Sequence, residues 1–234
     1  MQIAISEENI KTFQRALEAL NAAEIPYVVG GAFAMHYYSG VWRNTNDLDV
    51  YLPREYLPRA IRALSSAGFR DYGQMAAGDR EWIYHAVDHG VLVDLIWQTP
   101  HHLSSVDQSM YDRGPSGTFV DIPVRFIPAD ELVWAKMFTI NRHRCDWPDI
   151  FNVVKACPEG IDWNYLTLKM GEHWPVLLSF IVLFDWAYPG ESGCIPEAVR
   201  EDLLRKKQES SLQPENPSHE AVLDPWFYSR PISP

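Results

Sequence analysis

Residues 40–52 of this chain read G-V-W-R-N-T-N-D-L-D-V-Y-L, with two aspartates inside a part that reads as a buried strand. Side chains alternate across a strand, so Asp47 and Asp49 share one face while Leu48 and Val50 share the other. Two carboxylates held that close repel each other, and burying their charge is costly. A bound Mg²⁺ or Mn²⁺ would relieve both effects, because these ions prefer oxygen ligands. The alternative is an edge strand whose polar face meets water.

A glycine pair precedes this stretch. Residues 27–29 predict a short buried strand, which Gly30 and Gly31 break before a predicted helix over residues 32–38. At such a strand–glycine–helix turn the backbone N–H groups can approach a phosphate, and the helix dipole adds to the attraction. A simple tight turn is the alternative for the glycines taken alone.

A third aspartate follows in the apolar stretch V-L-V-D-L-I-W, residues 91–97. A lone buried carboxylate such as Asp94 indicates a metal ligand, a cap or a catalytic group. If this strand lies beside the one that carries Asp47 and Asp49, three acids converge near a phosphate-binding turn. Two-metal phosphoryl or nucleotidyl transfer needs such an arrangement.

The order of these motifs resembles the nucleotidyltransferase superfamily that includes DNA polymerase β. The R-x-T-x-D-L-D-V segment is similar to that of small bacterial members: antibiotic-modifying lincosamide and aminoglycoside nucleotidyltransferases, and abortive-infection or toxin-type enzymes. The chain departs from the family pattern in the long spacing from the glycines to the first aspartate. The residues that carry the resemblance are Gly30, Gly31, Arg43, Thr45, Asp47, Asp49 and Asp94.

The resemblance implies a role for each acidic residue. Asp47 and Asp49 would ligate the Mg²⁺ or Mn²⁺ that holds a nucleoside triphosphate. Asp94 would join them as a metal ligand and help to deprotonate an acceptor hydroxyl.

The resemblance also implies a set of nucleotide-binding residues. Gly30 and Gly31 would donate backbone N–H groups to the β- and γ-phosphates. Arg43 and Thr45 would contact phosphate or orient the loop, with a surface salt bridge as the equally weighted alternative for Arg43.

Residues 129–154 resemble the pair of helices that follows the catalytic domain in this family. Lys136 would contact phosphate, and the alternative is a lysine that extends its stem along an apolar surface. The aspartates at the second helix start are expected to be structural partners of the basic residues rather than catalysts. The residues concerned are Lys136, Arg142 or Arg144, Asp146 and Asp149.

The expected fold is α+β: a minimal nucleotidyltransferase fold with a mixed sheet, followed by a helical region. Residues 1–128 would form the catalytic domain, 129–207 the helical region and 208–234 a proline-rich tail. The predicted strands are 27–29, 47–52, 82–87, 91–97 and 118–127. The predicted helices are 7–23, 32–38, 54–67, 129–142, 147–156, 162–172, 174–187 and 196–207.

Composition indicates which partners and which cellular compartment to expect. The 234 residues carry a formal net charge of -11, so long-range attraction to nucleic acid is not built in. The three cysteines match no zinc spacing and are expected to be reduced thiols in the cytoplasm. The apolar run over residues 176–184 is too short to span a bilayer and predicts a buried helix, so we expect no membrane partner.

The predicted reaction is transfer of NMP from an NTP, which we expect to be ATP, to an acceptor hydroxyl with release of pyrophosphate. The acceptor could be a small molecule, a tRNA or a protein. One alternative is a non-catalytic nucleotide-binding protein, or a toxin–antitoxin component with a partner protein, that keeps the fold. The other is an α/β protein in which the three aspartates never meet.

Overall fold

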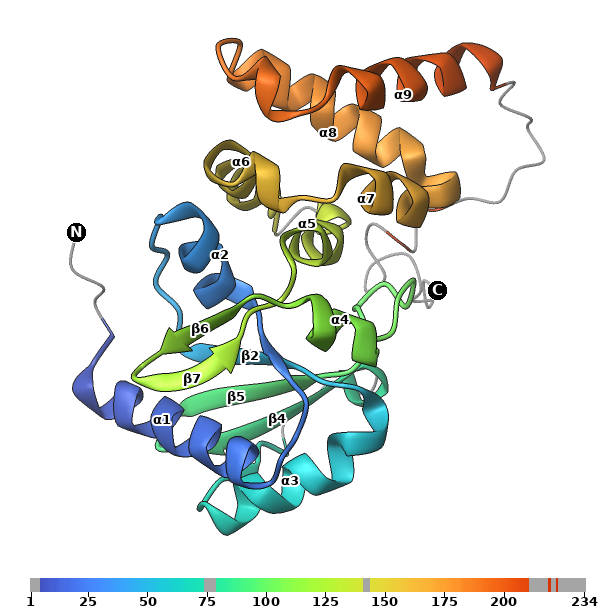
Figure 1. The fold of residues 1–234 in the computed structure, drawn as a ribbon. Helices are drawn as coiled ribbons and strands as arrows, with labels where there is room; N and C mark the ends of the chain where they lie inside the picture. The colour runs from blue at the N-terminus through green and yellow to red at the C-terminus, as the bar shows by residue number, and fades with distance from the viewer. Residues whose placement is uncertain (1–4, 74–78, 141–143, 211–218, 220–221, 223–234) are drawn as a thin grey trace, which may run out of the picture. The chain divides into compact units, whose positions relative to one another are not determined.

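The structure is a computed structural model that describes residues 5–73, 79–140, 144–210, 219 and 222. The chain divides into two compact units, Met1–Pro128 and Ala129–Pro234 (Figure 1). The boundary falls where the sequence changes from alternating strands and helices to helices alone.

A five-stranded sheet in the order β1-β2-β5-β4-β3 forms the centre of the N-terminal unit. The strands are Val28–Val29 (β1), Asp47–Tyr51 (β2), Arg70–Asp71 (β3), Ile83–Asp88 (β4) and Val91–Ile96 (β5). Strands β2 and β5 are parallel, whereas the other neighbouring pairs of this sheet are antiparallel. The mixed sheet and the helices around it confirm the predicted α+β class.

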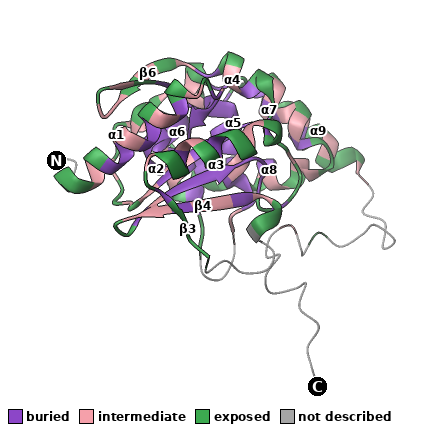
Figure 2. Ribbon diagram, turned by 90° about the horizontal axis from the view of Figure 1, so that it is seen from below, coloured by how far each residue is buried: buried purple, intermediate pink, exposed green. Residues whose placement is uncertain are grey.

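Helices cover this sheet and complete the N-terminal unit. They are Glu7–Ala22 (α1), Gly31–Ser39 (α2), Leu57–Ser66 (α3) and Gln108–Arg113 (α4), with 3-10 turns at Arg54–Tyr56 (η1) and Asp79–Glu81 (η2). Helices α1 and α3 lie side by side along one face of the sheet (Figure 1). That face carries the apolar side chains of β2 and β5, such as Leu48 and Val93, which are fully buried. Strand β5 in the middle of the sheet is largely buried, whereas the edge strand β3 is exposed (Figure 2).

The turn between β4 and β5 fixes the register of this hairpin. His89 and Gly90 both have positive φ, 47° and 81°, as a two-residue type I′ turn requires. Asp88 therefore pairs with Val91, and the two strands run antiparallel from that point. The predicted hairpin is confirmed, with its turn one residue shorter than the sequence indicated.

The predicted strand over residues 118–127 is wrong, because the chain turns in its middle. Two strands, Ser116–Phe119 (β6) and Ile122–Arg125 (β7), form a separate antiparallel hairpin. Its turn residues, Val120 and Asp121, have φ values of 46° and 63°. A β-branched residue is rarely found at positive φ, so the sequence carries no turn signal at Val120.

The C-terminal unit is helical within its described residues. Its helices are Ala129–Met137 (α5), Trp147–Ala156 (α6), Trp163–Met170 (α7), Trp174–Ala187 (α8) and Glu197–Glu209 (α9), with 3-10 turns at Pro158–Gly160 (η3), Gly171–His173 (η4) and Ser192–Cys194 (η5). Aromatic rings bind α6 to α8, with the Phe151 and Phe180 centroids 4.9 Å apart. The predicted helix over 129–142 is shorter and ends at Met137; residues 141–143 lie outside the described part.

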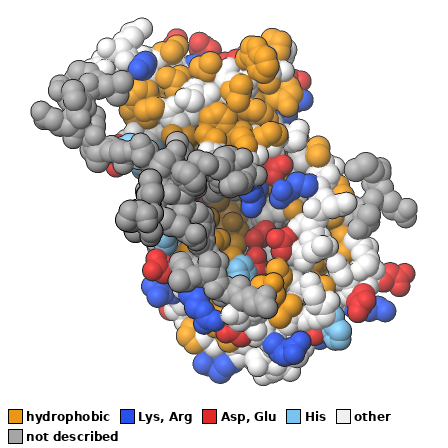
Figure 3. Space-filling model, turned by 180° about the vertical axis from the view of Figure 1, so that it is seen from behind, with side chains coloured by type: hydrophobic (Ala, Val, Ile, Leu, Met, Phe, Trp, Pro, Cys, Tyr) orange, Lys and Arg blue, Asp and Glu red, His pale blue; other side chains and the backbone are white. Residues whose placement is uncertain are grey.

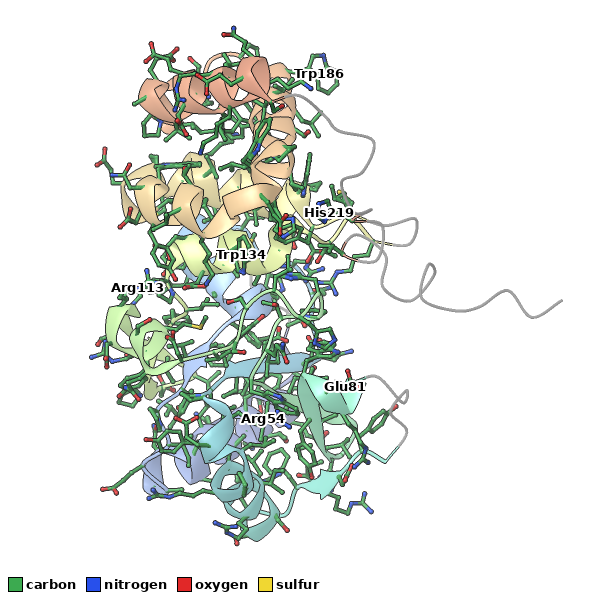
Figure 4. The ribbon with its side chains drawn as sticks, turned by 90° about the vertical axis from the view of Figure 1, so that its right-hand side faces the viewer. Arg54, Glu81, Arg113, Trp134, Trp186 and His219 are labelled. Atoms are coloured by element: carbon green, nitrogen blue, oxygen red, sulfur yellow. The ribbon has the colours of Figure 1, made fainter. Side chains whose placement is uncertain are left out.

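Helix α8 is buried along one face rather than all round, which corrects the prediction of a buried helix. Phe180 and Phe184 are fully buried, whereas Val182 is 59% and Trp186 80% exposed. Hydrophobic side chains cover much of the surface of the C-terminal unit in the view of Figure 3. Trp186, near the end of α8, lies at the outer edge of this unit (Figure 4).

The continuous helical stretch Trp163–Ala187 has the length and hydropathy of a membrane span, with 25 residues and a mean hydropathy of 1.2 in its most apolar window. Length and composition alone do not distinguish such a stretch from a core helix, so the expected absence of a membrane partner stays a prediction.

Candidate active site

The sheet register brings two of the predicted acidic residues directly opposite each other. Strand β2 lies parallel to β5, with Asp49 paired to Asp94 and Asp47 to Leu92. Residues that pair in a sheet share a face, and so do residues two apart on one strand. Asp47, Asp49 and Asp94 therefore lie on one face, opposite the apolar face that α1 and α3 cover. An arrangement in which Asp94 lies on the opposite face of the sheet from Asp47 and Asp49 is excluded.

The glycine pair lies against the same carboxylates. Gly31 begins α2 with a φ of +53°, and a Cβ at this position would lie 1.6 Å from Asp49 Oδ2. The helix start and the Asp49 carboxylate can come this close only because residue 31 has no side chain. The first-turn N–H groups of α2, which a helix leaves without intrahelical partners, thus begin beside the acidic face.

The N–H of Gly30 has a partner within the sheet. Its N–H donates to the Asp49 carbonyl at 2.9 Å, extending the ladder between β1 and β2. This geometry therefore gives no support to the predicted contact of the Gly30 N–H with phosphate. A Cβ at this position would lie 2.3 Å from the Tyr51 ring, so the ring would have to shift to admit any other residue. Of the two predicted glycine donors, Gly31 is the one that the proposed phosphate contact can use.

The loop between α2 and β2 places Thr45 on the acidic face. The Thr45 hydroxyl donates to Asp47 Oδ1, which holds the first carboxylate of the pair at the strand start. Arg43, two residues earlier, is exposed. The nucleotide-binding roles of both residues stay predictions.

His85 is the site residue that sequence reasoning missed. It lies on β4 as the register partner of Asp94, and its Nδ1 is 2.6 Å from Asp94 Oδ1. The sequence around the hairpin turn could have identified His85. A two-residue turn at His89 and Gly90 pairs Asp88 with Val91. Three residue pairs further from the turn, His85 then lies opposite Asp94.

Burial dominates the electrostatics of Asp94, which is 6% exposed. Burial raises the pKa of Asp94, the hydrogen bond and charge of His85 lower it, and the charge of Asp47 raises it again; the net pKa is raised. The site thus holds negative charge that a cation would stabilise, and its carboxylate oxygens are the donors that Mg²⁺ and Mn²⁺ prefer.

The described side chains of the acidic face do not form a closed set of metal ligands. Within the part of the chain that the structure describes, no three His, Cys, Asp or Glu side chains are grouped closely enough to hold a metal ion. The residues fit a divalent cation in donor chemistry and in backbone placement.

The raised pKa of Asp94 predicts that Asp94→Asn stabilises the metal-free protein at neutral pH. An acid whose pKa is higher in the folded state loses folding free energy as pH rises from its ordinary value of 3.8 through the folded value. Asparagine can still accept the His85 hydrogen bond and carries no charge. Urea unfolding with EDTA should show a higher midpoint for the variant at pH 7 and equal midpoints below pH 3.8. A variant that is less stable at pH 7 would contradict this account.

Lys136 belongs to an ion-pair cluster of the C-terminal unit. Its ammonium lies 2.6 Å from Asp146 Oδ2 and 3.3 Å from Asp149 Oδ2, and its side chain is 7% exposed. Arg144 donates two further hydrogen bonds to Asp146. The expectation that both aspartates are structural partners is confirmed. The same geometry gives no support to the predicted phosphate contact of Lys136, and Arg142 lies outside the described residues.

Opposing effects set the charge state of Asp146. Burial acts to raise the pKa of Asp146, but the hydrogen bond from Arg144 and the charge of Lys136 outweigh it, so the pKa is lowered. The cluster therefore stabilises the fold above the ordinary value of 3.8 and loses this contribution as pH falls below it.

Lys136→Met is expected to destabilise the protein by about 2–3 kcal/mol at pH 7. Removing one partner of a buried pair leaves a buried charge, and Arg144 keeps the cost below the usual ~3–5 kcal/mol. Urea unfolding measures the effect, and the difference from the wild type should narrow as pH falls below 3.8. The exposed Lys207→Met is the matched control and should leave stability unchanged. An unchanged midpoint in Lys136→Met would contradict the structural role.

A family model described as "Uncharacterised nucleotidyltransferase" matches residues 6–169, which include every residue of the acidic face and the glycine turn. No curated protein sequence matches the chain with significance.

Several solved structures are similar to the chain. The antibiotic-resistance factor ANT(2'')-Ia is 14% identical, with 79% of this chain and 95% of that chain covered at a TM-score of 0.47. The lincosamide antibiotic adenylyltransferase LnuA is 14% identical, with 64% and 96% covered at 0.45. JHP933 from Helicobacter pylori is 11% identical, with 88% and 97% covered at 0.44.

Proposed function

Because this chain belongs to a family of uncharacterised nucleotidyltransferases, we propose that it transfers NMP from an NTP to an acceptor hydroxyl with the aid of Mg²⁺ or Mn²⁺. The observation that carries the proposal is the pairing of Asp49 with Asp94 across β2 and β5, with Asp47 on the same face. The turn at Gly31 supports it, because the helix start lies against the Asp49 carboxylate.

Each residue of the site has a defined task in this reaction. Asp47 and Asp49 would hold the divalent cation, and Thr45 fixes the Asp47 carboxylate through its hydroxyl. The N–H of Gly31 and the positive end of the α2 dipole bind the phosphates that leave. When bound, the cation supplies Lewis acidity and neutralises charge on the phosphates.

The chemical step is a displacement at the α-phosphorus of the NTP. The acceptor oxygen forms a new bond to this phosphorus as the bond to the pyrophosphate oxygen breaks. Asp94 takes the proton of the acceptor hydroxyl, because its carboxylate faces the same side of the sheet as the pair that holds the nucleotide. A base with a raised pKa suits this task near neutral pH.

The substrates follow from the same considerations. We expect ATP as the nucleotide, and a small molecule, a tRNA or a protein as the acceptor. The net charge of -11 disfavours a large RNA held by long-range attraction. A nucleotide that is bound but not transferred would instead indicate a sensor or a toxin–antitoxin component that keeps the fold.

Ligand-linked stability tests the proposal first. Thermal unfolding with Mg²⁺ and each of ATP, CTP, GTP and UTP should show a rise in Tm with at least one nucleotide. The double variant Asp47→Asn/Asp49→Asn should lose that rise. Pyrophosphate release with a panel of hydroxyl acceptors then separates transfer from binding alone. A wild-type protein whose Tm responds to no nucleotide would refute the proposal.

A further inference from the structure

Three polar side chains form a row across three neighbouring strands. Asp49 on β2 pairs with Asp94 on β5, and Asp94 pairs in turn with His85 on β4. Backbone hydrogen bonds fix all three positions, so the row is a property of the sheet rather than of flexible loops. Asp94 stands in the middle and has an acidic neighbour on one side and an imidazole on the other.

The contact between His85 and Asp94 has the geometry of a strong hydrogen bond. The distance from His85 Nδ1 to Asp94 Oδ1 is 2.6 Å, and the two side chains are 19% and 9% exposed. A charge-assisted hydrogen bond of this length, shielded from water, holds both groups in one orientation. The carboxylate donates no proton when ionised, so Nδ1 carries the hydrogen and donates it.

A second histidine–aspartate pair on the same hairpin provides a contrast. His89 Nδ1 lies 2.9 Å from Asp88 Oδ1, but the His89 side chain is 71% exposed at the turn. Solvent competes with that contact, and nothing places it on the acidic face. The two pairs have the same chemistry and differ in burial and in location.

From this geometry we infer that His85 is a positioning residue for Asp94. By donating its Nδ1–H to Oδ1, it fixes the plane of the carboxylate and leaves Oδ2 for the divalent cation and the acceptor hydroxyl. Groups that orient a ligating carboxylate in this way commonly change metal affinity or activity by about 10–100-fold when removed. The inference rests on the proposed function, because it assigns Asp94 its task.

Two substitutions separate the two imidazole nitrogens. In His85→Asn the side-chain nitrogen occupies the position of Nδ1, so the hydrogen bond to Asp94 can form. In His85→Gln the nitrogen lies near the position of Nε2 instead. His85→Leu removes both donors at similar volume. His89→Asn is the control on the same hairpin, because asparagine tolerates the positive φ of this turn.

Two measurements compare the variants with the wild type. The EPR signal of free Mn²⁺ gives the Mn²⁺ dissociation constant. Pyrophosphate release gives kcat and KM. We expect His85→Leu and His85→Gln to weaken Mn²⁺ binding and lower kcat by about 10–100-fold. The KM for the nucleotide should change less than kcat, since Asp94 acts on the acceptor. His85→Asn should recover most of both losses, and His89→Asn should match the wild type.

Three results would overturn the inference. Wild-type Mn²⁺ affinity and kcat in His85→Leu would show that the hydrogen bond positions nothing. Recovery by His85→Gln but not by His85→Asn would assign the effect to Nε2. Equal losses in all three His85 variants, accompanied by a lower Tm, would show a merely structural contact. A wild-type protein that neither binds Mn²⁺ nor releases pyrophosphate would instead overturn the proposed function on which the inference rests.

Discussion

Asp49→Asn is expected to lower the rate of nucleotidyl transfer by more than about 100-fold, because loss of an outer-shell partner alone already costs about 10–100-fold. Asparagine has the size of aspartate, so it fits beside Gly31 without a new clash. The amide carries no negative charge and binds a hard divalent cation weakly. Pyrophosphate release in Mg²⁺ with the preferred nucleotide measures the loss.

Asp71→Asn is the control for this prediction. Asp71 lies on β3 of the same sheet, exposed to solvent and distant in strand order from β2. Its substitution should leave the rate unchanged within experimental error. A rate for Asp49→Asn within a few-fold of the wild type would remove Asp49 from the proposed metal site.

Gly31→Ala is expected to destabilise the fold by about 2–6 kcal/mol and to abolish transfer. An L-residue at a φ of +53° is strained by about 1–3 kcal/mol. The new methyl group would also meet Asp49 Oδ2 at 1.6 Å, and overpacking of this kind costs about 1–3 kcal/mol more. Either the carboxylate or the helix start must move, and both belong to the proposed site. Urea unfolding and pyrophosphate release measure the two effects.

Gly40→Ala isolates the part of this effect that comes from backbone strain, so its difference from Gly31→Ala gives the part that comes from the clash. Gly40 ends α2 with a φ of +67°, and a Cβ there would meet no atom within 4 Å. Its substitution should show the backbone strain alone, with activity retained. If Gly31→Ala were no more harmful than Gly40→Ala, the close approach of Asp49 to the helix start would not be needed.

The parts of this site that were predictable from sequence are those with a local signal. Alternation along residues 47–52 placed Asp47 and Asp49 on the face opposite Leu48. Gly30 and Gly31 marked a turn before a helix, since few other residues tolerate that backbone. Residues 129 onward changed to helical spacing, and the helix over residues 147–156 has the predicted bounds.

Other features had no local signal. The partner of β2 could have been any later strand, and the pairing of Asp49 with Asp94 emerges only from the assembled sheet. The split of the predicted strand at Val120 follows from a positive φ that a β-branched residue seldom adopts. The ammonium of Lys136 faces Asp146 because two helices meet, which its own helix does not reveal.

The sequence by itself determined which residues could form a metal and phosphate site, because side-chain chemistry and the alternation of a strand are local properties. The tertiary structure decided which of them meet. Strand pairing placed Asp94 between Asp49 and His85. The N–H of Gly30 donates to the Asp49 carbonyl. Lys136 forms ion pairs with two aspartates. Strand pairing and helix packing join residues far apart in the chain, and their register depends on the burial of the whole core.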